Sequence, residues 1–192
     1  MNRDNLLRGL SKVAWAYVLL FFDLNLGTLN LLPEWAGYLL LGQAIVLLGT
    51  QVRDLPLLRP FCLLLGLWAG LDWVVVLLGG SLEALPYLVN LVIIVVSVYF
   101  HFQLLTGLAA LAARYQPEGM TLDRKLAVCR TLNVLIITLR YLCALFFPVP
   151  WVILAITLAG FVVCLFLLCY LFALRNVIRR QGEAETPAEN SQ

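Results

Sequence analysis

The sequence predicts an all-α polytopic membrane protein whose six transmembrane helices form three outward hairpins, with both termini in the cytoplasm. The first observation is composition: 62% of the 192 residues are hydrophobic and only 12% are charged, against roughly half and a quarter in soluble domains. The second is that the apolar residues form long runs, and about 18 apolar residues can cross a membrane as a helix. The third is that lysine and arginine fall in alternate connections between the runs.

The apolar runs are expected to be helices rather than strands. Backbone amides inside a bilayer must be hydrogen-bonded within the protein, and the runs lack the alternating pattern of a lipid-facing barrel strand. We expect helices over 13–32, 35–52, 61–79, 86–113, 126–147 and 151–174. Residues 1–180 then form a single six-helix membrane domain, and the polar residues 181–192, which contain no aromatic side chain, a disordered cytoplasmic tail.

The first run is less regular than the others. Its second half, DLNLGTLNLLP, is more polar and contains Asn and Gly, so the chain either continues there as helix or unwinds after Phe22. Before this run, residues 1–12 combine Leu6, Leu7 and Leu10 with three basic residues. That pattern is typical of a helical turn lying on an anionic membrane surface.

The basic residues predict the orientation. If every run crosses once, twelve of the thirteen lie on one side, and lysine and arginine are enriched in short cytoplasmic loops. These twelve are Arg3, Arg8, Lys12, Arg53, Arg59, Arg114, Arg124, Lys125, Arg130, Arg175, Arg179 and Arg180. Each outer connection instead places a proline and an aromatic residue at the start of the next helix. Proline is favoured at the first position of a helix, and Trp and Tyr are favoured at the membrane interface. The pairs are Pro33 with Trp35, Pro86 with Tyr87, and Pro150 with Trp151.

Two charged residues fall inside the predicted spans, where ionisable groups are expensive and usually face a partner or a wet cavity. Asp72 is eleven residues beyond Phe61, and Arg140 is fourteen beyond Leu126. Both therefore lie on the order of 16 to 21 Å above the cytoplasmic boundary. The sequence predicts an ion pair between them, which either only locks two helices together or contributes to a transport site.

Asp23 would leave one carboxylate unpaired at this depth. On a continuous first helix it lies about 15 Å above the cytoplasmic boundary, where a surplus acid is protonated or hydrated. It is then a candidate proton or cation site together with Asp72 and Arg140. On an unwound chain it lies in a shallow outer vestibule instead, and both alternatives stay open at this point.

A stripe of polar residues runs along the fourth predicted helix. Tyr87, Asn90, Ser97 and His101 recur at intervals that place them on one helical face. Such a face turns toward protein or water rather than lipid. The stripe either forms hydrogen bonds between helices or lines a polar pathway, in which His101, the only histidine, is a titratable group.

The motifs of common catalytic sites do not occur in this sequence. There is no GxSxG, HExxH, Walker or Rossmann motif and no paired Cys/His spacing, so the sequence predicts no cofactor and no metal site. The five cysteines all lie inside apolar runs and are expected to be packing residues. An enzyme is therefore not favoured, and a membrane-embedded lipid-processing enzyme ranks third among the functional alternatives.

Residues 23–43, DLNLGTLNLLPEWAGYLLLGQ, carry a resemblance. An acid is followed by a Gly/Asn-containing link and then by Leu-Pro-acid-aromatic-x-Gly-Tyr. This segment resembles one in small uncharacterised multi-pass bacterial membrane proteins. The resemblance implies a bacterial cytoplasmic (plasma) membrane protein with a broken first hairpin, and no activity comes with it.

Two function classes remain. The intramembrane charges and the polar stripe favour a membrane subunit that transports or binds a small solute or cation. Each of these features also has a packing explanation, which favours a non-catalytic accessory or structural membrane subunit. The expected partners are the lipid bilayer and, on the first alternative, the solute; a homo-oligomer or larger membrane complex stays open, and nucleic acid is not expected.

Overall fold

A computed structural model describes residues 3–21, 25–26, 29–30, 33–80, 82, 87–146 and 149–189. In this part of the chain the protein is built from six α-helices, with one short 3-10 helix and one pair of two-residue strands. The elements are α1 (Arg3–Phe21), β1 (Asn25–Leu26), β2 (Leu29–Asn30), α2 (Glu34–Leu48), η1 (Leu55–Leu58), α3 (Arg59–Leu77), α4 (Tyr87–Tyr115), α5 (Leu122–Phe146) and α6 (Pro150–Glu189).

Four of these helices are long and apolar enough to cross a membrane: α3 together with η1, α4, α5 and α6. The chain is accordingly an integral membrane protein. α2 has only 15 residues, about 22 Å of helix against a hydrocarbon core of roughly 30 Å. α1 has 19 residues but begins with a charged segment. The helical fold class is confirmed, while six complete membrane crossings remain a prediction.

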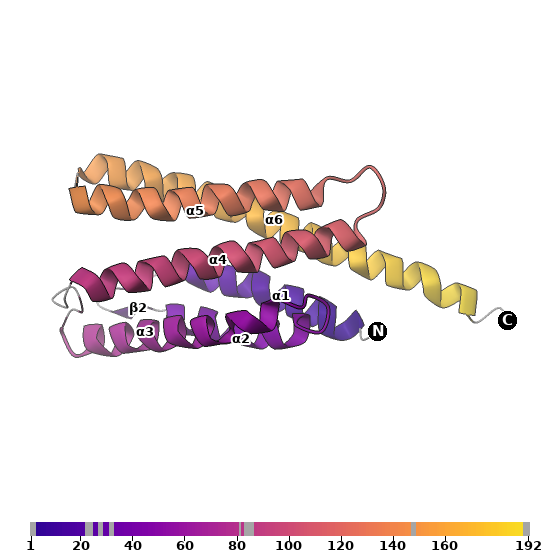
Figure 1. Ribbon diagram of the computed structural model, residues 1–192, viewed down its shortest axis with the longest axis horizontal. Helices are drawn as coiled ribbons and strands as arrows, with labels where there is room; N and C mark the ends of the chain where they lie inside the picture. The colour runs from indigo at the N-terminus through magenta and orange to yellow at the C-terminus, as the bar shows by residue number, and fades with distance from the viewer. Residues whose placement is uncertain are drawn as a thin grey trace.

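The helices lie side by side along one axis, and successive helices run in alternate directions (Figure 1). α4 lies between α1–α3 and the α5–α6 pair in this view. α1 packs on α2 and α6, α2 on α3, and α5 on both α4 and α6. α1 begins and α6 ends at the same end of the bundle, called the N/C end below, and the opposite end is called the far end.

The three predicted hairpins are packed unequally. The α1–α2 and α5–α6 pairs are in extensive contact, whereas α3 and α4 contact each other much less. α3 contributes only Cys62 and Leu65 to the buried core. The middle hairpin is thus held mainly through its neighbours, α3 by α2 and α4 by α5.

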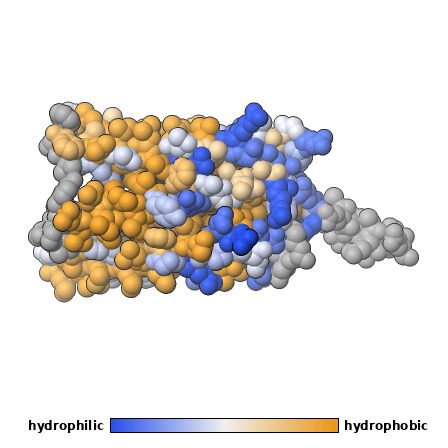
Figure 2. Space-filling model, viewed as in Figure 1, coloured by the Kyte–Doolittle hydropathy of each residue, from blue (hydrophilic) through white to orange (hydrophobic). Residues whose placement is uncertain are grey.

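The buried core is concentrated toward the N/C end. In α4 the first buried residue among those described is Phe100, and in α5 the last one is Asn133. In α3 the last buried residue among those described is Leu65, and in α6 the first one is Gly160. Hydrophilic residues gather on the surface near the N/C end, whereas the surface toward the far end is almost uniformly hydrophobic (Figure 2).

The start of α1 belongs to this core. Leu6 and Leu10 are each only 1% exposed and are part of the buried hydrophobic cluster. The expectation that residues 1–12 lie on a membrane surface is therefore wrong for these leucines. They are buried because α1 extends as one continuous helix from Arg3, and its apolar face packs on neighbouring helices.

A close crossing joins α1 to α2. A Cβ atom added at Gly37 would lie 2.8 Å from Leu20 Cγ and 3.1 Å from the backbone oxygen of Ala16. At Gly9 it would lie 2.8 Å from Leu48 Cγ. Only glycine allows the two helix backbones to approach this closely without displacing a neighbour.

The first predicted helix ends early. α1 stops at Phe21, and the chain continues as the antiparallel pair β1–β2, in which Asn25 pairs with Asn30 and Leu26 with Leu29. Helix does not continue to residue 32, in agreement with the alternative in which the chain unwinds. Asp23 itself lies outside the described residues.

Polar contacts hold the N/C end together. The Tyr115 hydroxyl donates to Gln51 Oε1 at 3.2 Å, and Gln181 Nε2 donates to the backbone oxygen of Tyr115 at 2.8 Å. These bonds join α4 to the α2–α3 connection and to α6. Gly119, with a φ of 88°, allows the tight turn between α4 and α5.

The final helix is longer than expected. The sequence predicts a disordered tail over 181–192, whereas α6 continues as helix to Glu189. Alanine and glutamate, which recur in this segment, are strong helix formers and can extend a helix that is already established.

Candidate functional site

A buried pair of polar side chains links α1 to α4. The Tyr17 hydroxyl and His101 Nδ1 are 3.2 Å apart, within hydrogen-bond distance. Tyr17 is fully buried and His101 is only 5% exposed. Because a buried polar group without a partner costs free energy, each side chain satisfies the other.

Aromatic rings surround this pair. The His101 ring centroid lies 5.3 Å from that of Phe100 and 6.4 Å from that of Tyr38, which belongs to α2. Phe21 stacks on Tyr17 with centroids 6.0 Å apart. Three helices thus enclose one imidazole, and we call Tyr17, Tyr38 and His101 the polar core cluster.

The polar core cluster lies at the level where tight packing ends. Tyr17 is the last buried residue of α1, and Phe100 and His101 are the first buried described residues of α4. Toward the far end, the described part of α4 is only half-buried or exposed. The cluster is therefore at the boundary between the packed half of the bundle and the more open half.

The predicted stripe on α4 has different environments along its length. His101 is buried, whereas Asn90 and Ser97 are half-buried nearer the far end. Ser97 lies near the side chain of Tyr38, so the stripe faces α2 at this level. Tyr87 is the first residue of α4, and its side chain lies outside the described part of the structure.

Asp72 and Arg140 are not brought together. Both side chains are exposed, and α3 and α5 are not among the closely packed helix pairs. Neither residue forms an ion pair or a hydrogen bond within the described chain. The depths of the two residues were compatible with pairing, but depth does not specify the side of the helix on which a residue projects. The predicted ion pair is not formed.

Sequence reasoning missed three polar residues in the helix interfaces. Arg130, assigned to the cytoplasmic boundary, instead packs against α4: its Nη1 donates to Thr106 Oγ1 at 3.0 Å, and its guanidinium lies 4.4 Å from the Phe102 ring centroid. Asn133, one turn further along α5, is only 3% exposed. Tyr17 is the third. Polar residues in otherwise apolar runs were the available signal for all three.

Asn133 has an unsatisfied donor in the part of the chain that the structure describes. Its Nδ2 atom is buried and has no hydrogen-bond partner there, and the same holds for Arg130 Nε. The N–H groups of these two atoms can each donate a hydrogen bond to an additional partner without losing one to protein.

The described residues contain no group of three or more His, Cys, Asp or Glu side chains placed to hold a metal ion. The cysteines are all free thiols, and three of them, Cys62, Cys129 and Cys164, are buried. Cys62 Sγ donates to the backbone oxygen of Tyr38 at 3.2 Å, which is a packing role between α2 and α3.

Comparison with known proteins identifies no relative: no protein-family model, no curated protein and no solved structure matches this chain.

Proposed function

We propose that this is a six-span protein of the bacterial cytoplasmic membrane, with both termini in the cytoplasm, that binds and transports a small polar solute or cation. The observation that carries the proposal is the buried Tyr17–His101 pair at the boundary between packed and open halves of the bundle. Polar groups inside a membrane protein commonly mark substrate pathways.

The chemistry of the polar core cluster suits a small polar ligand. A neutral imidazole carries one donor and one acceptor nitrogen, and each tyrosine hydroxyl can donate or accept. The aromatic rings of Tyr38 and Phe100 beside His101 also suit an organic cation, which is attracted to the faces of aromatic rings. The described residues offer no buried acid at this site, so a cation would be bound by dipoles and ring faces.

The arrangement of the helices supports the proposed topology. α1 begins and α6 ends at one end of the bundle, and the twelve basic residues assigned to the cytoplasm belong to connections and helix segments of that half. Ligand access is proposed from the far end, where the described parts of α3, α4, α5 and α6 carry no buried residue.

Flux into proteoliposomes tests the proposal. Protons, alkali cations and a set of organic cations are the probes, and electrogenic uptake is recorded on a supported membrane. Tyr17→Phe removes the hydroxyl and retains the ring, so uptake is expected to fall about tenfold, since a hydrogen bond to a buried group contributes about 1.5 kcal/mol. Tyr99→Phe is the matched control, because Tyr99 is exposed and phenylalanine keeps its ring contact with Phe61 of α3. Wild-type uptake equal to that of empty vesicles for all probes would exclude transport of these solutes.

A second candidate function is an accessory subunit of a membrane complex. Asp72 and Arg140 favour it, because both are exposed among apolar residues in helices long enough to cross the membrane and have no ion-pair partner in the described chain. A charge facing lipid is costly, and a partner protein that supplied a counter-charge would remove the cost. On this alternative Asp72→Asn and Arg140→Gln abolish co-purification of a partner and leave the isolated chain folded, whereas Tyr17→Phe does not affect co-purification.

A further inference from the structure

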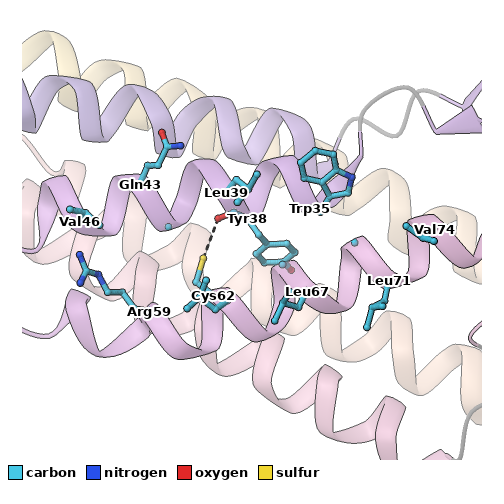
Figure 3. A pocket seen from close by; sticks show the side chains of 14 residues that line it. Trp35, Tyr38, Leu39, Gln43, Val46, Arg59, Cys62, Leu67, Leu71 and Val74 are labelled. Carbon is cyan, nitrogen blue, oxygen red and sulfur yellow. Dashed lines mark hydrogen bonds between the residues drawn. The ribbon is translucent and has the colours of Figure 1, made fainter.

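A groove runs along the surface between α2 and α3. It has a volume of about 760 Å³, within the range of ligand-binding pockets. Exposed apolar side chains form its walls, among them Leu39 of α2 and Leu63 and Leu67 of α3. Figure 3 shows these two helices lying side by side with the lining side chains between and along them.

Glycines create the space in this groove. Gly42, Gly66 and Gly70 all line it. A Cβ atom at Gly70 would meet only Trp35 Cβ, at 3.9 Å, and one at Gly42 only Cys62 Sγ, at 3.8 Å. Both positions are therefore open enough for a larger side chain to enter the groove.

The two ends of the groove differ in charge. Arg59 and Gln43 lie toward one end, and Trp35 and Val74 toward the other (Figure 3). The Arg59 guanidinium is exposed and forms no hydrogen bond or ion pair with any residue that the structure describes. Lys12 of α1, which does not line the groove, donates from Nζ to Gln43 Oε1, so Arg59 is the cationic side chain of the groove.

We propose that this groove binds an anionic phospholipid, with an acyl chain along the α2–α3 walls and its phosphate at Arg59. Arginine recognises phosphate with paired N–H donors, and basic pockets between transmembrane helices on the cytoplasmic side are suited to anionic headgroups. This inference does not depend on the proposed solute site, which lies between α1, α2 and α4.

A lipid suits the groove better than a second helix does. The GxxxG pair of α3, Gly66 and Gly70, is of the type that packs two transmembrane helices closely. Here it already faces α2, since the nearest atoms to the added Cβ positions are Cβ of Tyr38 and Cβ of Trp35. A partner helix would also leave the unpaired Arg59 guanidinium without a counter-charge unless it carried an acid at that level.

Native mass spectrometry of the purified chain in detergent tests the proposal. Dioleoyl phosphatidylglycerol and dioleoyl phosphatidylcholine are titrated separately, and bound lipids per chain are counted. One phosphatidylglycerol is expected to bind more tightly than the others, and phosphatidylcholine is expected to show no such site. Arg59→Gln should weaken that site about fivefold, since a basic residue near an anionic lipid contributes about 1 kcal/mol. Arg53→Gln is the matched control, because Arg53 is exposed in the same connection but does not line the groove.

Filling the groove provides the second test. Gly70→Leu and Gly42→Leu should each remove the tight phosphatidylglycerol site, whereas Ala155→Leu, which adds bulk to an exposed position on α6, should retain it. Thermal unfolding of each variant in detergent verifies that it is folded. One folded glycine variant is enough to test whether the lipid occupies the groove.

Three results would overturn the proposal. Equal weakening by Arg53→Gln and Arg59→Gln would mean general surface attraction only. Loss of the site in Arg59→Gln but not in the folded glycine variants would mean an anion site that does not use the groove. A dimer that dissociates in the glycine variants, without a change in lipid binding, would mean that a second copy of the chain occupies it.

Discussion

His101 shows how a single residue can be identified from sequence but understood only with its neighbours. Its place on the polar face of the fourth helix follows from spacing, yet its hydrogen-bond partner, Tyr17, is 84 residues away in the sequence. The rings of Phe100 and Tyr38 close around it. If His101 lines a pathway, Tyr17→Phe should lower uptake. If His101 only packs, Tyr17→Phe should lower the stability of the protein alone.

We expect Tyr17→Phe to lower the stability of the protein by about 1–3 kcal/mol, because it leaves a buried imidazole nitrogen without its partner. The apparent melting temperature in detergent measures the effect, with Tyr99→Phe as the exposed control. An unchanged melting temperature in Tyr17→Phe would show that the 3.2 Å contact between Tyr17 and His101 is not a stabilising hydrogen bond.

Gly37→Ala is expected to destabilise the α1–α2 contact by about 1–3 kcal/mol, the usual cost of overpacking. The added methyl group would overlap Leu20 Cγ and the backbone oxygen of Ala16, and backbone cannot move aside as a side chain can. The control is Gly42→Ala, where the nearest atom would be 3.8 Å away. The same thermal assay applies, and equal melting temperatures for the two variants would contradict the close crossing.

At the scale of whole elements, Arg130 of α5 contacts α4, although its position in the sequence predicts that it lies at the cytoplasmic boundary of the membrane. Arg130 bonds to Thr106 and lies over Phe102, whereas Arg140, assigned to an intramembrane ion pair, projects away from the protein. Ten residues separate them on one helix, so they project about 80° apart around its axis, given 3.6 residues per turn. Arg130 and Arg140 therefore differ both in the side of α5 on which they project and in their level, since no described residue of α5 beyond Asn133 is buried.

Arg130→Met should therefore lower stability by about 1–2 kcal/mol, because it removes a hydrogen bond and a cation–π contact while keeping an unbranched side chain. Arg140→Met should have no comparable effect on the isolated chain. Guanidine or thermal unfolding of the two variants, followed by helical circular dichroism, compares them directly. A larger loss in Arg140→Met would restore the intramembrane pairing of Arg140 as a stabilising contact.

The whole molecule combines a packed half at the N/C end with a less buried half at the far end. Buried residues of α1, α2, α4, α5 and α6 meet in the first half, where polar contacts also join α4 to α6. In the second half, lipid or other molecules must cover side chains that the helices leave exposed. This asymmetry is why access to the polar core cluster is proposed from the far end.

Cysteine labelling tests this organisation. Leu78, which directly follows α3, is 82% exposed. In a background without the five native cysteines, Leu78→Cys should react with a membrane-impermeant maleimide added to intact cells. Glu118→Cys, in the exposed α4–α5 turn, should react only after the membrane is opened. The reverse pattern would invert the proposed topology, and labelling of both sites from outside would mean that α4 does not cross.

Composition, the lengths of the apolar runs and their charge pattern determined that this is a helical membrane protein, because a bilayer requires internally bonded, apolar helices. The polar face of α4 was also accessible from residue pattern, whereas the end of the first helix near Phe22 was only one of two alternatives that the pattern left open. Which side chains meet was decided only by the tertiary structure. The Tyr17–His101 bond, the inward Arg130, the outward Asp72 and Arg140 and the α2–α3 groove all depend on how each helix is rotated about its axis, and that rotation follows from packing against neighbours distant in the sequence.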